Sequence, residues 1–253
     1  MKSKLILFYL LITIHTMVLA QTGELKNRQV HAIQQLINVF KTNNKIKIAE
    51  SIDYPLRREY PLKDVKNKTD FIQRFDEIFN KDFINSVANS KIKDWAQVGW
   101  RGIMFDDGTM WIDEKGKITS INYQSPKEKE LLAHSIQENK SQLPKSLQSF
   151  EIPMYLIITK NYKIRIDQMS EGIFRYAAWK NKNQKTEPDI VIENGALEFD
   201  GSGGNEEITF KINEFTYIIY INEVREGNFP DASLEVKRGE QTLLTENGRI
   251  KRN

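Results

Sequence analysis

The 253-residue chain contains no cysteine. This excludes disulfide bonds, thiolate nucleophiles and cysteine metal ligands, and it also excludes a lipid anchor attached through a cysteine. Hydrophobic residues make up 40% of the chain, an ordinary fraction for a globular protein. Because a chain of this length can bury a large core, we expect the fold to be stable without covalent cross-links.

Histidine is also scarce, with three in the whole chain. His15 belongs to the N-terminal segment, His31 falls on the polar face of a predicted helix, and His134 lies in a polar stretch. A Ser-His-Asp triad needs a histidine inside a pocket, and a histidine metal site needs several together. We therefore predict no catalytic residue, no metal site and no cofactor, although a calcium site built from carboxylates alone is compatible with the sequence.

The chain lacks an excess of charge of one sign. It has 37 Lys and Arg against 34 Asp and Glu, and two of the lysines lie in the first 20 residues. Without those residues the balance is 35 to 34. Nucleic-acid-binding proteins usually concentrate basic residues on one face, so the composition argues against a nucleic-acid partner.

The first 20 residues have the pattern of a secretory signal peptide. Lys2 and Lys4 form a positive start, Leu5–Leu19 is apolar, and Val18 and Ala20 are permissive for cleavage before Gln21. The apolar run is shorter than the roughly 20 residues of a membrane span, and a histidine interrupts it. We expect residues 1–20 to be removed, leaving a periplasmic or secreted protein without a stable membrane span.

Residues 26–124 change from a helical pattern to a strand pattern. Apolar residues recur at helical spacing over residues 26–41 and 71–79, and from residue 95 the period becomes two. Asp107-Gly108 is a strong hairpin signal because both residues accept positive φ. A turn there pairs Met104 with Trp111, and residues 118–123 are expected to return as a third strand.

Residues 125–150 are expected to form a linker helix. Ser125 can cap it, Pro126 fits the first helical position, and Glu128 completes a capping box. Apolar support is thin up to residue 150, so we place a domain boundary near 145–152. Residues 151–253 contain many short strands between turns, which predicts an all-β sandwich or barrel.

The first domain resembles the nuclear-transport-factor-2-like fold, a cone that ketosteroid isomerase shares. The residues that carry the resemblance are the Phe71–Phe79 helix, the Trp95–Met104 segment and the hairpin into Met110-Trp111-Ile112. The chain is also similar to uncharacterised exported bacterial proteins that place such a cone before a small β domain. The resemblance implies an α+β class, with N-terminal helices packed on a curved antiparallel sheet around a cavity. The aspartate base and tyrosine donor of the isomerases do not align residue by residue and are not transferred.

Alternation along the expected strands selects candidate ligand-binding residues. Trp100, Met104 and Trp111 share one face and could line the cavity of the cone, with ordinary core packing as the alternative. Arg101 falls on the opposite face, where it could anchor an anionic ligand or pair with a carboxylate such as Glu59, because a guanidinium among apolar neighbours is costly unless it is paired.

Two adjacent arginines give a further candidate. Arg57 and Arg58 lie in the extended segment Tyr54–Tyr60, and strand alternation puts them on opposite faces. One of them could reach the mouth of the pocket while the other is solvated. We take Arg57 as the candidate, and the alternative is that both are solvated or ion-paired.

These features favour an exported, non-catalytic binding protein. Its cone pocket would hold a small apolar or anionic ligand, or dock an envelope protein. The first alternative is an isomerase or dehydratase that uses one perturbed carboxylate in an apolar cavity. The second is an envelope interaction or inhibitor protein that acts through the β domain. A titratable side chain with a perturbed pKa pointing into a cavity would separate an enzyme from a binder.

Overall fold

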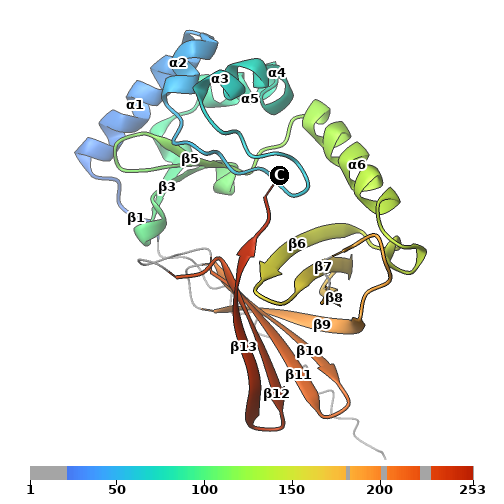
Figure 1. Cartoon of the computed structure of the whole chain (residues 1–253). Helices are drawn as coiled ribbons and strands as arrows, with labels where there is room; N and C mark the ends of the chain where they lie inside the picture. Colours follow the sequence, from blue (N-terminus) through green and yellow to red (C-terminus); the bar gives the residue numbers. More distant parts are fainter. Residues whose placement is uncertain (1–21, 181–182, 201–203, 223–228, 253) are drawn as a thin grey trace, which may run out of the picture.

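The computed structural model describes residues 22–180, 183–200, 204–222 and 229–252. The predicted signal peptide and its cleavage site lie outside the described residues. The chain forms a helical part with a small sheet, a long linker helix and a closed barrel (Figure 1). The α+β class expected from the sequence is therefore confirmed.

The N-terminal part joins short helices to an antiparallel sheet whose strands follow one another in chain order. The helices are α1 (Asn27–Lys41), α2 (Lys45–Glu50), α3 (Lys68–Gln73), α4 (Phe75–Ile78) and α5 (Lys81–Ala88). The strands are β1 (Thr22–Gly23), β2 (Trp95–Val98), β3 (Ile103–Phe105), β4 (Met110–Ile112) and β5 (Ile118–Ile121). The stripe predicted on the first helix is buried, and it packs in one core with the phenylalanines that follow residue 70.

The hairpin predicted around Asp107-Gly108 is confirmed. Met104 lies opposite Trp111, Phe105 lies opposite Met110, and β5 pairs with β4 as the third strand. The connection has four residues, and Asp107 adopts a positive φ of 51° as the turn requires. Ile103, Phe105 and their partners on β4 are buried, whereas Met104 and Trp111 lie on the other, half-exposed face of the sheet.

The strand predicted from residue 95 to residue 105 is interrupted, which corrects the expected register. A 3-10 turn, Gly99–Arg101, separates β2 from β3. It is followed by Gly102, whose φ is 101°, and a Cβ on that residue would lie 2.5 Å from the Ile112 carbonyl oxygen. Because only glycine fits there, the chain turns, and Trp100 is 62% exposed instead of sharing a strand face with Met104.

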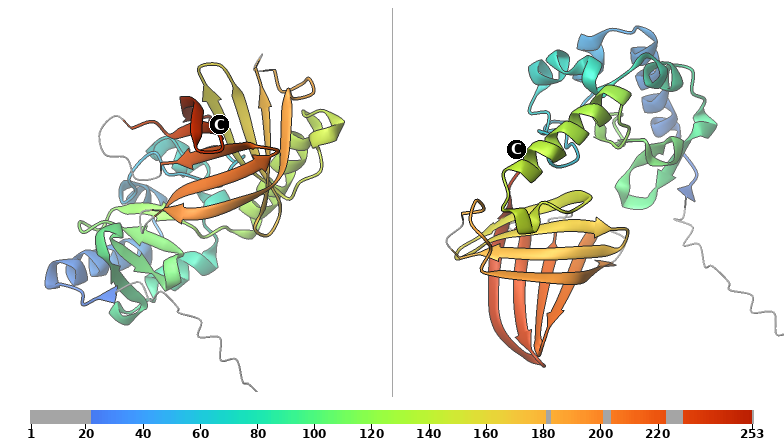
Figure 2. Two further views of the ribbon diagram at one scale, coloured as in Figure 1. Left: turned by 90° about the horizontal axis from the view of Figure 1, so that it is seen from below. Right: turned by 90° about the vertical axis from the view of Figure 1, so that its right-hand side faces the viewer.

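The linker helix α6 (Pro126–Ser141) begins as predicted. The Ser125 hydroxyl accepts the Glu128 N–H at 3.0 Å, and Pro126 occupies the first turn. The carboxylate of Glu128 does not complete a capping box, because it binds the guanidinium of Arg58 instead. Figure 2 shows α6 running between the helical part and the barrel.

The C-terminal part is an up-and-down barrel, which decides between the two β architectures expected. Each strand pairs with the next, and β13 pairs with β6 to close the barrel. Its strands are β6 (Ile152–Thr159), β7 (Lys163–Ser170), β8 (Ile173–Trp179), β9 (Ile190–Asp200), β10 (Asn205–Ile212), β11 (Phe215–Ile221), β12 (Ala232–Arg238) and β13 (Gln241–Ile250). Isoleucine, phenylalanine and tyrosine side chains fill the interior as a second core.

The segment after α6 packs against the outside of this barrel, contrary to the thin apolar support expected from the sequence. Leu143, Leu147 and Phe150 are buried against Ala177 and Trp179, whose strand neighbours point inward. Alternation along β7 and β8 also turns charged side chains outward, under this covering segment. The outer face of the barrel therefore carries a third, mixed core of apolar and charged groups.

Candidate functional site

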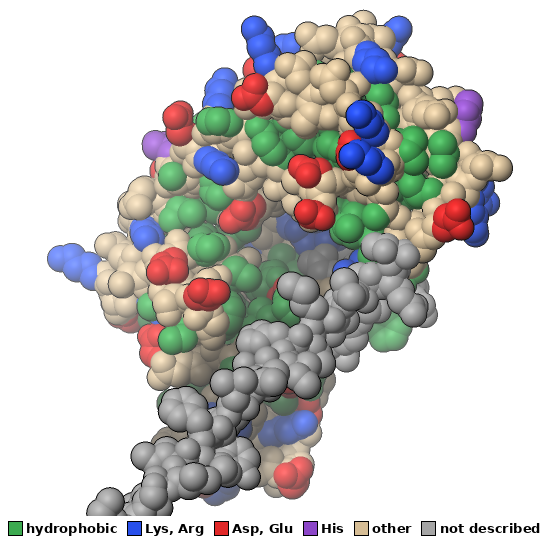
Figure 3. All heavy atoms as spheres, turned by 180° about the vertical axis from the view of Figure 1, so that it is seen from behind, with side chains coloured by type: hydrophobic (Ala, Val, Ile, Leu, Met, Phe, Trp, Pro, Cys, Tyr) green, Lys and Arg blue, Asp and Glu red, His purple; other side chains and the backbone are tan. Residues whose placement is uncertain are grey.

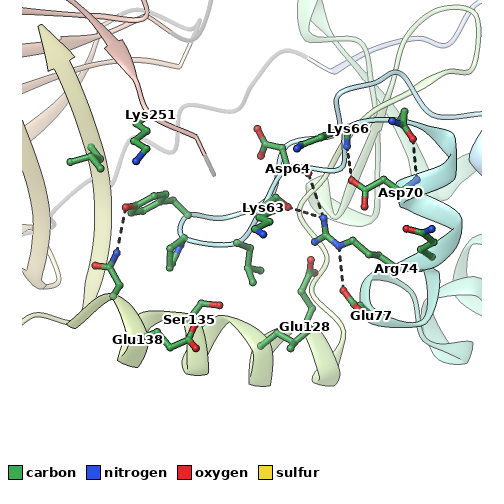
Figure 4. A pocket seen from close by; sticks show the side chains of 18 of the residues that line it. Lys63, Asp64, Lys66, Asp70, Arg74, Glu77, Glu128, Ser135, Glu138 and Lys251 are labelled. Carbon is green, nitrogen blue, oxygen red and sulfur yellow. Dashed lines mark hydrogen bonds and ion pairs between the residues drawn. The ribbon is translucent and has the colours of Figure 1, made fainter. Parts of the chain in front are cut away.

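A cleft of about 900 Å³ lies between the helical part, α6 and the barrel (Figure 4). One wall is the segment from Tyr60 to α3, and α6 forms another with Leu131, Ser135 and Glu138. The barrel contributes Leu156 from β6, Gln184 from the connection between β8 and β9, and Lys251 after β13. The volume lies within the range of about 300–1,000 Å³ that is typical of ligand pockets.

A buried ion pair joins the segment just before Tyr60, where one wall of the cleft begins, to α6. Arg58 donates from Nε to Glu128 Oε1 at 2.7 Å and from Nη2 to Glu128 Oε2. Its remaining N–H groups meet the Ile121 and Tyr123 carbonyls, the latter at 2.9 Å. One cation thus meets one anion and two carbonyls, which is the condition under which a buried pair is stable.

A second buried cluster lies on the barrel side, on the outward faces of β7 and β8. Asp167 Oδ2 accepts from Arg165 Nε at 2.9 Å and from Arg175 Nη2 at 2.8 Å, and Arg165 Nη2 lies 2.6 Å from Asp167 Oδ1. The relative exposures of Arg165, Asp167 and Arg175 are 1%, 0% and 2%. Two buried cations share one carboxylate, so the cluster carries an excess positive charge.

The covering segment supplies partners for these two guanidiniums. Arg175 donates to the Leu147 carbonyl at 2.8 Å and to the Ser149 carbonyl at 3.1 Å. The Arg165 guanidinium lies 4.8 Å from the centroid of the Phe150 ring, and the Arg175 guanidinium lies 6.0 Å from it. The π face and the carbonyls partly offset the excess charge without neutralising it.

Tyr60 connects this cluster to the cleft. Burial raises the pKa of its hydroxyl, and the neighbouring Arg165 and Asn139 side chains oppose that rise. Asn139 Nδ2, on α6, lies 3.5 Å from the hydroxyl oxygen. A tyrosine with a raised pKa stays protonated at neutral pH, so Tyr60 offers the cleft a hydrogen-bond donor rather than a base.

The lining carries both charge signs, and several of its acids are already engaged. Glu77 accepts from Arg74 at 3.3 Å, and Asp70 accepts the Lys66 backbone N–H at 2.9 Å. Asp64 accepts the backbone N–H of Arg58 at 2.9 Å. Figure 4 shows Lys251 on the barrel side and the acids Asp70 and Glu77 on the opposite side.

The residues that line the cleft include both charge signs and several hydrogen-bonding side chains. No histidine is among the described residues that line the cleft; His31 and His134 are exposed, and His134 Nδ1 lies 3.7 Å from Glu138 Oε1. Within the described part of the chain, no group of three or more His, Asp or Glu side chains is placed to hold a metal ion. The polar groups of the cleft can instead orient a charged or hydrogen-bonding ligand.

The candidate residues chosen from the sequence lie away from this cleft. Trp100 and Arg101 are exposed on the 3-10 turn, and Met104 borders a separate hollow of about 380 Å³ beside α5. Trp111 lies opposite Met104 on the half-exposed face of the sheet. Arg57 is exposed and does not line the cleft, and its neighbour Arg58 turns inward to Glu128, so the two side chains lie on opposite faces as predicted.

Sequence reasoning missed Tyr60 and the barrel residues Gln184 and Lys251 that line the cleft, and it missed the buried Arg165 behind them. Charged residues at every second position of β7 normally indicate a solvated face. The available signal was the group of apolar residues at 143, 147 and 150, which needs a surface to cover. Joining the two observations would have predicted a buried charged cluster.

Comparison of the chain with protein-family models, curated proteins and solved structures found no match. In the part of the chain that the structure describes, no helix has the length and apolarity to span a membrane. On the face drawn in Figure 3, basic and acidic side chains of the described residues are interspersed over the helical part.

Proposed function

We propose that the chain is an exported, non-catalytic binding protein whose ligand lies in the cleft between the helical part and the barrel. Export is supported by the signal-peptide pattern of residues 1–20. The observation that carries the binding function is a polar cleft of about 900 Å³, beside which the buried Arg58–Glu128 ion pair joins the helical part to α6. A cleft with fixed walls is preorganised, and preorganisation lowers the cost of binding.

The ligand that fits such a lining is polar and carries charge. Lysine and acidic side chains both line the cleft, together with the hydroxyl and amide groups of Tyr60, Ser135 and Asn139. A purely apolar ligand would leave these groups without partners, which costs free energy for every group that is desolvated. Of the two ligand classes considered from the sequence, the charged one is favoured.

The relationship to the nuclear-transport-factor-2-like cone is part of the same proposal. The helices that precede a meander of antiparallel strands support it. The expected cavity of that cone is filled here by Phe71, Phe75, Phe79 and Met110, all with relative exposures of 0–2%. We infer that the helical part serves as one wall of the cleft rather than as the container of the ligand.

Tyr60 is the feature that keeps the enzymatic alternative worth testing. A tyrosine whose pKa is raised by burial could polarise a carbonyl group in an isomerase or dehydratase. Such a reaction also needs a base, and two carboxylates of the cleft, Glu77 and Glu128, are held by arginines. The geometry therefore favours binding over proton transfer.

Native mass spectrometry of the protein purified from its host tests the proposal. We expect a co-purifying small molecule that Ser135→Trp excludes, because the indole would project from α6 into the cleft. Ala133→Trp is the matched control, since Ala133 is exposed on the same helix and does not line the cleft. A ligand retained equally by both variants, or a wild-type protein with no ligand, would count against the cleft.

A further inference from the structure

We propose that the barrel-side end of the cleft is a subsite for an anionic oxygen group of the ligand, a carboxylate or a phosphate. The inference rests on the proposed binding function and adds the chemical class of the ligand. Three observations support it: donors from three segments that line the same cleft, an unbalanced buried charge behind them, and two neighbouring lysines on the barrel side.

The donors come from three separate segments. Tyr60 begins the wall that leads to α3, Gln184 lies in the connection between β8 and β9, and Lys251 follows β13. All three line the cleft. The Tyr60 oxygen is approached by Asn139 Nδ2, which leaves its own proton for another acceptor. Gln184 Nε2 is buried and has no acceptor among the described residues. Buried donors of this kind usually have a partner, and an anionic oxygen would supply one.

The charge behind these donors is positive. Arg165 and Arg175 share the single carboxylate of Asp167, and Arg175 Nε is buried without an acceptor among the described residues. Arg165 also lies next to the hydroxyl of Tyr60, which places its charge directly behind the cleft. An excess buried cation is costly, and an anion at the cleft end would lower that cost.

Lys251, at the same end of the cleft, lies near a second lysine on β7, Lys163. Burial lowers the pKa of Lys163, and the nearby Lys251 ammonium lowers it further. An anionic group between the donors would lie beside Lys251 and oppose this repulsion. The opposite wall carries both charge signs, with Asp70 and Glu77 among Lys66, Lys68 and Arg74.

Isothermal titration calorimetry with inorganic phosphate and with acetate tests the subsite directly. We expect saturable binding of at least one probe, with a dissociation constant that rises about tenfold in Tyr60→Phe and in Lys251→Gln, since each removes one hydrogen bond to a charged group. Lys129→Gln is the control, because Lys129 is exposed on α6 outside the cleft. Phosphate binding without acetate binding would point to a phosphate ligand, and the reverse to a carboxylate.

Two results would overturn the subsite. One is that neither probe binds, and the other is that both variants bind as tightly as the wild type while their unfolding midpoints are unchanged. If a variant fails to fold, the chemical shifts of the Lys251 side chain in the wild-type protein decide: they must move on addition of the bound probe. A co-purifying ligand that is neutral or cationic would uphold the binding function and refute the anionic subsite.

Discussion

Arg58 meets one carboxylate and two carbonyls, whereas Arg165 and Arg175 must share a single carboxylate. Both sites are buried, and each holds the linker against one of the two halves of the molecule. The first is balanced in charge, and each of the three guanidinium nitrogens donates at least one hydrogen bond. The second keeps an excess cation and a donor without an acceptor among the described residues.

The difference separates a structural role from a functional one. A balanced buried pair has a structural role, because removing either member leaves an uncompensated buried charge and destabilises the fold. An unbalanced cluster costs stability in the unliganded protein, and such a cost is typical of sites that bind something. The position of the unbalanced cluster, behind Tyr60 at the end of the cleft, agrees with this interpretation.

The balanced site should give the largest loss of stability. Glu128→Gln removes the carboxylate that pairs with Arg58 and leaves a buried guanidinium, so we expect a loss of about 3–5 kcal/mol in the free energy of unfolding. Urea denaturation of the full chain measures it. Glu130→Gln, on the exposed side of the same helix, should change stability by less than about 0.5 kcal/mol. Similar midpoints for both variants would contradict the structural role of the pair.

The two sites should differ when an arginine is removed. Arg58→Met leaves Glu128 without a cation, and the expected loss is again about 3–5 kcal/mol. Arg165→Met leaves Asp167 paired with Arg175 and removes the excess charge, so we expect a loss of only about 1–2 kcal/mol. The same urea series checks the difference. Equal losses would mean that the second cluster is no less balanced than the first.

Phe150 gives a smaller effect that is specific to the second site. Its ring centroid lies 4.7 Å from Lys140 Nζ and 4.8 Å from the Arg165 guanidinium, and Phe150→Leu would keep the apolar contact while removing the π face. We expect a loss of about 1–2 kcal/mol in thermal or urea unfolding. For comparison, Phe215→Leu should cost less, since Phe215 faces only the exposed Arg238 at 5.9 Å among the cation–ring pairs described. The reverse order would show that the Phe150 ring contributes only packing.

Local patterns predicted much of the fold. The helical stripe of α1, the capping serine of α6 and the pairing of Met104 with Trp111 each depend on residues close in sequence, and all three are confirmed. The turn at Gly99–Arg101 was not predicted, because the alternation of apolar residues does not show that position 102 tolerates only glycine.

The cleft could not be predicted because its parts are distant in the chain. Arg58 and Glu128 are 70 residues apart, and neither residue signals its partner locally. The capping-box pattern even assigned Glu128 to the backbone, since a local partner was available and the tertiary one was not visible. Likewise, Arg165 and Asp167 resemble a solvated strand face until the covering segment is placed over them.

The lysines beside the second site offer the finest test of the comparison. The pKa of Lys163 lies below its ordinary value of 10.5 because of burial and, secondarily, because of Lys251. A lowered folded-state pKa means that the folded protein releases a proton, so this group makes stability rise as the pH increases towards 10.5. Lys251→Gln should move the Lys163 pKa part of the way back towards 10.5, since burial remains, and should weaken the rise in stability with pH.

Side-chain carbon chemical shifts followed through a pH titration measure the Lys163 pKa in both proteins. Saturating phosphate should raise the Lys163 pKa in the wild type and leave it unchanged in Lys251→Gln. If neither the substitution nor the anion changes the Lys163 pKa, the excess positive charge on the barrel side does not contribute to the electrostatic potential in the cleft.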